Sequence, residues 1–242
     1  VEEQAEKKEE EQQQRQPAAG RIQVPTKPIP LVVNGREYER TLWEASRLGV
    51  LAVVRQMLDA ASRGGQAINA EDDIGNTALH YAANEGKVEV AKLLIEKGAN
   101  VNAKGSGNSW TPLHSAVYGA HKDLVKLLLD HKADPNAATT TQWTPMHSAA
   151  SEGQVPIISL LLDAGANINA ANFSGKTPIY LAAAGEHAST VKFLLEKGAD
   201  PMIETPEGST ASDAALGVGA SDLANFITSW VVEMKRHKEG VI

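Results

Sequence analysis

Histidine is the side chain in this sequence best suited to acid–base or metal chemistry near neutral pH. The chain has 7 histidines and no cysteine, and His80, His114 and His147 recur at intervals of 34 and 33 residues. A zinc site needs about four ligands around one ion. Ligands that occur once in each repeated unit would instead lie in a line about 10 Å apart, the width of a helix pair. We therefore expect no metal site.

Motifs for nucleophilic catalysis are missing from the sequence. There is no Gly-x-Ser-x-Gly motif, and without cysteine a thiol nucleophile or an iron–sulfur site is excluded. The glycine-rich run at 105–107 does not continue into the Gly-Lys-Ser/Thr ending of a phosphate-binding loop. The acidic pair at 72–73 falls at the tip of a turn, where solvated carboxylates are far more common than catalytic ones. We therefore expect no enzyme activity, no catalytic residue and no cofactor.

The charge of the chain argues against nucleic acid or a membrane as its partner. Lys and Arg number 23 and Asp and Glu number 30, which gives a net charge of −7, whereas both partners attract clustered basic residues. No run approaches the roughly 18 apolar residues of a membrane span. The lack of cysteine is typical of a reducing, intracellular compartment. We expect the cytoplasm, and the nucleus or an organelle stays open because the chain starts at Val1, so a missing targeting peptide is uninformative.

Two segments at the N-terminus differ in composition from the rest. Residues 1–16 are almost entirely charged or amide side chains, which predicts a solvated acidic and Gln-rich tail. Residues 17–39 contain four prolines, so we predict an extended arm. Asn34-Gly35 lies between apolar residues in this arm, and such a pair is the strongest short signal for a hairpin.

From residue 40 onward the sequence repeats itself. A threonine recurs at intervals of 34, 33, 33 and 33 residues, at Thr77, Thr111, Thr144, Thr177 and Thr210. A sustained period of about 33 residues predicts a stack of repeated units in place of one globular core. The threonine can cap a first helix, and the proline that follows it in three units suits the first turn. An apolar stripe then predicts a second helix in each unit.

Glycine ends the second helix in three units, at Gly98, Gly165 and Gly198. A left-handed residue is typical of this position, and glycine adopts that conformation without strain. Lys132 takes this place in another unit, where the same backbone would cost about 1 kcal/mol. The second helix is followed by a run such as Ala99–Ala103, which we predict to be extended.

The stretch at 75–103, GNTALHYAANEGKVEVAKLLIEKGANVNA, resembles an ankyrin repeat, and four consecutive units match this pattern closely. The resemblance covers residues 40–238. It implies an all-α ankyrin-repeat solenoid of about six helix–turn–helix units, including degenerate caps, joined by β-hairpin loops. The first and last units depart most from the pattern, and repeat stacks need such caps at both ends. Residues 239–242 are then a C-terminal tail.

The resemblance also implies structural roles for recurring polar residues. In ankyrin repeats the histidine of the Thr-Pro-Leu-His motif bridges backbone groups near the helix start, which is the role we expect for His80, His114 and His147. Asn102 and the equivalent residues Asn136 and Asn169 resemble sites of asparaginyl hydroxylation in the family. A structural role in the hairpin already explains these three residues.

For function, the resemblance implies a non-catalytic scaffold or adaptor that binds another protein on a concave face. Its usual contact positions are the hairpin tips, the residues just before the threonine, and those just past the small alanine pair. By register, the predicted partner-binding residues are Asp73, Ile74, Asn76, Asn84, Glu85, Asn108, Trp110, Tyr118, Thr140, Thr141, Trp143, Ser151, Glu152, Phe173, Ser174 and Lys176.

Four aromatic residues stand out in this set. Trp110 and Trp143 precede the threonine in adjacent units, so we expect them side by side, flanked by Tyr118 and Phe173. Tryptophan and tyrosine dominate the energetics of protein interfaces. The alternative is that each tryptophan packs on its neighbouring hairpin. Beyond the tail and the arm, the segment 41–242 contains 16 basic and 22 acidic residues. This net negative charge favours a partner with a basic or mixed surface.

Two other functions stay open on the sequence. The chain could be a structural subunit of a large assembly, anchored by its N-terminal arm and its C-terminal helix. It could also be the regulatory or targeting domain of a larger protein. In the last helix Trp230, Val231 and Met234 either cover the final repeat or meet a partner, and we favour the covering role.

Overall fold

A computed structural model gives the fold and describes residues 29–33, 36–61, 68–105 and 107–238. The predicted tail at 1–16, the first part of the arm and the segment at 239–242 lie outside these residues. Two short strands, β1 (Ile29–Val33) and β2 (Arg36–Arg40), pair antiparallel with Val33 opposite Arg36. The pairing brackets Asn34-Gly35, where the sequence predicts a hairpin.

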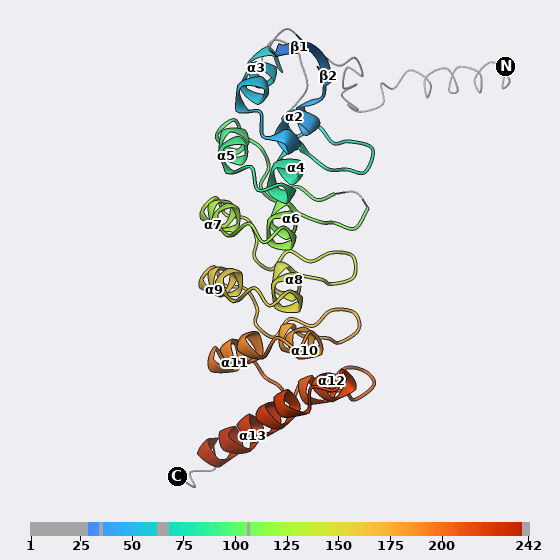
Figure 1. Cartoon of the computed structure of the whole chain (residues 1–242), viewed down its shortest axis with the longest axis vertical. Helices are drawn as coiled ribbons and strands as arrows, with labels where there is room; N and C mark the ends of the chain where they lie inside the picture. The colour runs from blue at the N-terminus through green and yellow to red at the C-terminus, as the bar shows by residue number, and fades with distance from the viewer. Residues whose placement is uncertain (1–28, 34–35, 62–67, 106, 239–242) are drawn as a thin grey trace, which may run out of the picture.

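Six helix pairs follow in the described residues and stack in a single row, which confirms the predicted all-α solenoid (Figure 1). The first helices of the pairs are α2 (Leu42–Leu48), α4 (Ala78–Asn84), α6 (Pro112–Tyr118), α8 (Pro145–Ser151), α10 (Pro178–Ala184) and α12 (Ala211–Gly217). The second helices are α3 (Leu51–Ala61), α5 (Val88–Glu96), α7 (Lys122–Asp130), α9 (Val155–Asp163), α11 (Ala188–Glu196) and α13 (Ser221–Lys238). In Figure 1 the second helices from α3 to α11 form the outer column, and α13 runs at an angle across the C-terminal end. The loops between units project from the opposite side.

The core is a set of columns that run through the stack, because each repeat buries the same register positions. One column lies two residues after the threonine and consists of Leu79, Leu113, Met146 and Ile179. A second column on the second helices consists of Leu94, Leu128, Leu161 and Leu194. An alanine five residues after the threonine is fully buried in each of five units, so neighbouring first helices can approach closely. Each repeat therefore depends on its neighbours for burial.

The run at Ala99–Ala103 is a turn, so the extended conformation predicted for it is wrong. The N–H of Ala103 donates to the carbonyl of Asn100 at 3.2 Å, and the N–H of Asn102 donates to Asn100 Oδ1 at 3.0 Å. The asparagine side chain mimics a backbone turn, and this local bond decides the conformation.

The helix-ending residues are left-handed in four units, which confirms the prediction for Lys132. The φ angle of Lys132 is +67°, and those of Gly98, Gly165 and Gly198 are +95°, +89° and +90°. A residue with a Cβ atom is strained in this region, whereas glycine is not.

Lys132→Gly should therefore raise the free energy of unfolding by about 0.5–1 kcal/mol, because the relief of strain exceeds the added entropy of the unfolded chain. Gly165→Ala is the matched reverse change, since nothing lies within 4 Å of an added Cβ there and only the strain is introduced. It should lower stability by about 1 kcal/mol. Urea unfolding measures both, and a loss of stability in Lys132→Gly would contradict this explanation.

The C-terminal end of the stack is incompletely covered. The register position six residues after the threonine is fully buried in the units that contain Ala83, Val117, Ala150 and Ala183. In the last unit this position is Leu216, which is 54% exposed. Helix α13 has 18 residues against 9 in α11, and its half-buried Trp230 packs against the core, in line with the covering role. No helix in the described part of the chain is long and apolar enough to cross a lipid bilayer.

Candidate functional site: a groove on the finger face

The loops before α4, α6, α8, α10 and α12 project together from one side of the stack (Figure 1), and we refer to them as fingers 1 to 5. The fingers and the C-terminal ends of the first helices form one surface, here termed the finger face. Adjacent fingers are joined by backbone hydrogen bonds. The N–H of Thr140 donates to the carbonyl of Asn108 at 3.0 Å, and the N–H of Phe173 donates to the carbonyl of Thr141 at 3.1 Å. Fingers 2, 3 and 4 are therefore held as a continuous rim.

Buried histidines hold fingers 2, 3 and 4 against the first helix of the preceding unit. His114 Nδ1 accepts hydrogen bonds from the Thr111 backbone N–H at 3.2 Å and from the Thr111 hydroxyl at 2.8 Å. Because Nδ1 accepts, the ring proton lies on Nε2, which donates to the Trp143 carbonyl at 3.1 Å. His80 and His147 repeat this arrangement, with Nε2 at 3.0 Å from the Trp110 carbonyl and at 3.1 Å from the Lys176 carbonyl. These contacts support the structural role that the ankyrin resemblance implies for all three histidines.

These histidines are neutral at physiological pH. Burial lowers the pKa of His114 and of His147 from 6.5 to about 4, and it also lowers the pKa of His80. The hydrogen bond from each Nε2 to a carbonyl opposes this shift without cancelling it. In the fourth matching unit Tyr180 takes the place of the histidine, and its hydroxyl lies 3.5 Å from Ser209 Oγ on the next finger.

Asparagine side chains in the turns that follow the second helices link consecutive units. Asn102 Nδ2 donates to the Lys132 carbonyl at 3.1 Å, and Asn102 Oδ1 accepts from the Asp134 N–H at 2.8 Å. Asn136 likewise contacts the Gly165 carbonyl and the Asn167 N–H. In both residues the side-chain amide donates one hydrogen bond and accepts another from the next unit. These bonds give Asn102 and Asn136 a structural role.

Two cavities open on the finger face and share a wall. The larger has a volume of about 640 Å³ and lies between fingers 1 and 2, and the smaller, of about 330 Å³, lies between fingers 2 and 3. The residues common to both are Asn108, Trp110 and Tyr118. Because they share this wall, we treat the two cavities as one groove. The other predicted binding residues along this groove are Ile74, Asn76, Asn84, Thr140, Thr141, Trp143, Ser151 and Glu152.

Tyr118 is the most prominent side chain of the groove. It is the last residue of α6, and 66% of it is exposed. Its ring meets the ring of Trp110 almost at a right angle, with 6.3 Å between centroids and 77° between planes. The Trp110 ring also lies against the His114 ring, at 5.0 Å between centroids. The Trp110 ring is therefore packed in the wall of the groove, while the Tyr118 ring is exposed to solvent.

The two tryptophans both line the smaller cavity, and each also has a packing role. Trp143 Nε1–H donates to Ser148 Oγ at 2.8 Å, and its ring lies 5.4 Å from that of His147. Both tryptophans are half-buried, and their carbonyls accept the histidine bonds described above. The sequence left binding and packing as alternatives for the two tryptophans. The contacts show that much of each side chain is packed against its own repeat.

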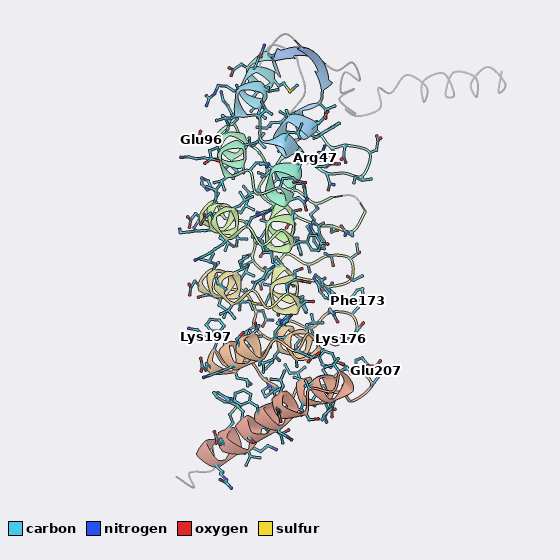
Figure 2. The ribbon with its side chains drawn as sticks, in the orientation of Figure 1. Arg47, Glu96, Phe173, Lys176, Lys197 and Glu207 are labelled. Atoms are coloured by element: carbon cyan, nitrogen blue, oxygen red, sulfur yellow. The ribbon has the colours of Figure 1, made fainter. Side chains whose placement is uncertain are left out.

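Five predicted residues do not line either cavity among the described residues: Asp73, Glu85, Phe173, Ser174 and Lys176. Phe173 is 70% exposed on finger 4, and Lys176 lies nearer the helix, 5.6 Å from the Tyr180 ring (Figure 2). Glu85 follows Asn84 and is exposed beside it. Phe173 is therefore outside the groove, whereas Tyr118 lies in it.

Tyr81 and the serines at the same register position were missing from the predicted set. Tyr81 lines the larger cavity together with Ser115, and Ser148 lines the smaller one. All three lie four residues after the threonine, so the helical register could have identified them. The Tyr81 hydroxyl donates to Asp72 Oδ2 at 2.5 Å, and burial raises the pKa of Tyr81. Asp72 Oδ1 accepts from the backbone of finger 1, so this carboxylate orders the fingertip as well.

The chemical character of the groove is set by the side chains that line its two cavities. None of the described residues form a cluster of His, Asp or Glu that could hold a metal ion. The histidines nearest the groove have their ring nitrogens engaged with backbone groups. The lining is mostly aromatic, amide and hydroxyl groups, with one carboxylate from Glu152, and this mixture suits recognition of another molecule.

Comparison with known families decides what this repeat is. A family model described as "Ankyrin repeats (3 copies)" matches three overlapping segments, at residues 42–139, 104–172 and 134–205. This chain is an ankyrin repeat protein. Ankyrin repeats are generally protein-interaction modules, and the family assignment agrees with the repeat period, the threonine–histidine motif and the stacked helix pairs.

Individual ankyrin proteins resemble parts of this chain. It is 37% identical over 117 residues to human BCL-6 corepressor-like protein 1, a match that covers 48% of this chain and 6% of that protein. It is 44% identical over 75 residues to mouse 2-5A-dependent ribonuclease, covering 31% of this chain and 10% of that protein. It is 45% identical over 60 residues to mouse protein phosphatase 1 regulatory subunit 12A, a match that covers 25% of this chain and 6% of that protein. The matches span only a small part of each relative, so they are evidence for the ankyrin stack alone.

Proposed function

We propose that this chain is a non-catalytic ankyrin module, a scaffold or adaptor that binds a partner protein in the groove on its finger face. The observation that carries the proposal is the exposure of Tyr118 beside Trp110, where the two cavities meet. A large aromatic side chain left in solvent at the centre of a groove is typical of an interface, because tyrosine and tryptophan contribute most to binding energy.

The rigidity of the groove supports this proposal. Hydrogen bonds between Asn108 and Thr140, and from His114 to the finger 3 backbone, fix both walls of the smaller cavity before any partner arrives. A preorganised surface loses little conformational entropy on binding, so more of the contact energy appears as affinity.

Tyr118→Ala should weaken partner binding by about 30-fold, the equivalent of about 2 kcal/mol for an aromatic interface residue. The partner is first identified by affinity purification of the full chain and mass spectrometry, and the dissociation constant is then measured by calorimetry. Because Tyr118 is mostly exposed, the Tm should stay within a few degrees of that of the unchanged protein. The Trp110→Ala, Trp143→Ala double variant should instead lose both binding and stability.

A second candidate places the partner at the C-terminal end of the stack. A cavity of about 620 Å³ lies between α11 and α13 and includes Phe226, while Leu216 and Val232 are exposed nearby. This arrangement suits a structural subunit anchored through its last helix. Phe226→Ala is the matched control: it should leave partner binding unchanged if the finger face binds, and a loss confined to Phe226→Ala would favour the second candidate.

The chain also suits a regulatory or targeting part of a larger protein, since it matches only 6% to 18% of the length of its first eight relatives. In that case the groove would recruit a protein to the activity of another domain. A longer reading frame with a catalytic domain would support this variant of the proposal.

A further inference from the structure

We infer that the corner formed by Trp110 and Tyr118 takes a positively charged side chain, the lysine or arginine of an extended segment of the partner. This inference deepens the proposed function and rests on it. The corner offers aromatic faces on two sides, with 77° between the planes of the two rings. Tyr81 adds a third aromatic ring to the same 640 Å³ cavity. A cation is attracted to the faces of such rings by their quadrupole.

The electrostatics of the groove agree with a cationic occupant. Neither cavity is lined by any Lys or Arg among the described residues, whereas Glu152 lines the smaller one. Asp72 holds its carboxylate against the Tyr81 hydroxyl at the edge of the larger one. Lys104 lies outside this lining, and Arg47 and Lys176 lie towards the two ends of the face (Figure 2). A positively charged group in the corner would therefore meet aromatic rings and carboxylates, with no Lys or Arg among the described lining residues. Arg47 acts electrostatically on the Tyr81 hydroxyl of the larger cavity, so the basic side chain fits best over Tyr118, on the side of Glu152.

The repeat register places a carboxylate on either side of Tyr118. Glu85 and Glu152 occupy the same position of the units before and after it, eight residues beyond the threonine, and both are exposed. The unit of Tyr118 itself has Gly119 at that position, which leaves the ring uncovered. A long, flexible basic side chain could thus lie over the ring with a carboxylate within reach on each side.

The groove is also long enough for an extended segment. Its two cavities run across fingers 1, 2 and 3, from Ile74 to Thr141, and the shared wall lies at the middle. The amide and hydroxyl side chains along it, including Asn76, Asn84 and Ser151, can bond to a peptide backbone. The basic side chain in the corner would then set the register of that segment.

The test uses the full chain labelled with ¹⁵N and two synthetic pentapeptides that differ in one residue. One peptide has lysine at its centre and the other has norleucine, which keeps the methylene chain and lacks the ammonium group. The signal is the indole N–H of Trp110, assigned by comparison with Trp110→Phe, and the indole of Trp230 serves as the internal reference. We expect saturable shifts of the Trp110 signal with the lysine peptide and about tenfold weaker binding of the norleucine peptide. An arginine peptide should behave like the lysine peptide.

Variants of Tyr118 separate cation binding from simple apolar contact. Tyr118→Phe keeps the ring and should bind the lysine peptide within about twofold of the unchanged protein, whereas Tyr118→Leu keeps apolar area without a ring and should bind about tenfold more weakly. Glu152→Gln should weaken binding about threefold and reduce its dependence on salt. Equal binding of the lysine and norleucine peptides, or no change at Trp110, would overturn the inference.

These outcomes are distinct from those that test the proposed function. If no peptide binds at Trp110 while Tyr118→Ala still weakens the partner, the inference is wrong and the proposed function stands. If the lysine peptide binds but Tyr118→Ala leaves the partner's affinity unchanged, the proposed function is wrong, and the cation has no role in it.

Discussion

His114→Ala should lower the free energy of unfolding by about 3–4 kcal/mol. The side chain is fully buried and joins two repeats, because Nδ1 accepts from Thr111 and Nε2 donates to the Trp143 carbonyl. Its loss removes a helix cap contact, leaves that carbonyl without its donor and opens a cavity beneath the Trp110 ring. Each of these effects costs about 1 kcal/mol or more.

The measurement is urea unfolding followed by circular dichroism, with His131→Ala as the matched control. His131 is exposed at the end of α7 and its ring contacts only the Leu127 carbonyl of its own helix among the hydrogen bonds described. The control should lose about 0.5 kcal/mol or less. Equal losses in the two variants would show that the link between repeats adds little to stability.

The stability of the stack should fall as the pH is lowered from about 7 to 5. The pKa of His114 and of His147 is about 4 in the folded protein, against about 6.5 in an unfolded chain. Between these values the unfolded state binds more protons than the folded state, so the free energy of unfolding rises with pH and falls on acidification. The contribution of these two residues is fully present above pH 6.5 and is lost towards pH 4.

The expected size of this effect is large because burial is the main cause of each lowered pKa. Each of the two histidines should account for about 2 kcal/mol between pH 7 and 5, and His80 adds to the loss because burial lowers its pKa too. Urea midpoints at pH 7, 6 and 5 give the measurement. The loss between pH 7 and 5 should shrink by about 2 kcal/mol, the share of one histidine, in His147→Gln. A stability that does not change over this range would contradict the burial of neutral histidines.

Much of the fold follows from local patterns in the sequence. A threonine precedes each matching first helix, and proline follows it in three of these four units. The position of Lys132 is left-handed because its repeat register matches that of Gly98 and Gly165. Such features depend on a few neighbouring residues and repeat in every unit. The turn at Ala99–Ala103 was predicted wrongly because the Asn100 side chain accepts a hydrogen bond from the Asn102 N–H, and this local bond favours a turn over the extended conformation.

The residues of the candidate site were harder to predict from the sequence than the fold. Trp110, Trp143 and Tyr118 come together as expected, since adjacent repeats bring equal register positions side by side. The placing of Phe173 outside the groove and of Tyr81 within it depends on where each side chain points, which the repeat pattern does not specify. Similarly, the hydrogen bond between Asn108 and Thr140 joins backbone groups and leaves no trace in residue type.

The most direct test of the central claim, that the finger face binds a partner protein, is site-specific photo-crosslinking. The photoreactive amino acid p-benzoylphenylalanine replaces Tyr118 in one sample and Phe226 in the other. The crosslinked partner is detected by mass spectrometry. Both positions hold an aromatic side chain that reaches the surface, with 66% of Tyr118 and 37% of Phe226 exposed. The expected result is a crosslinked partner from position 118 and none from position 226. Crosslinking from position 226 alone would contradict the account and place the partner at the C-terminal end of the stack.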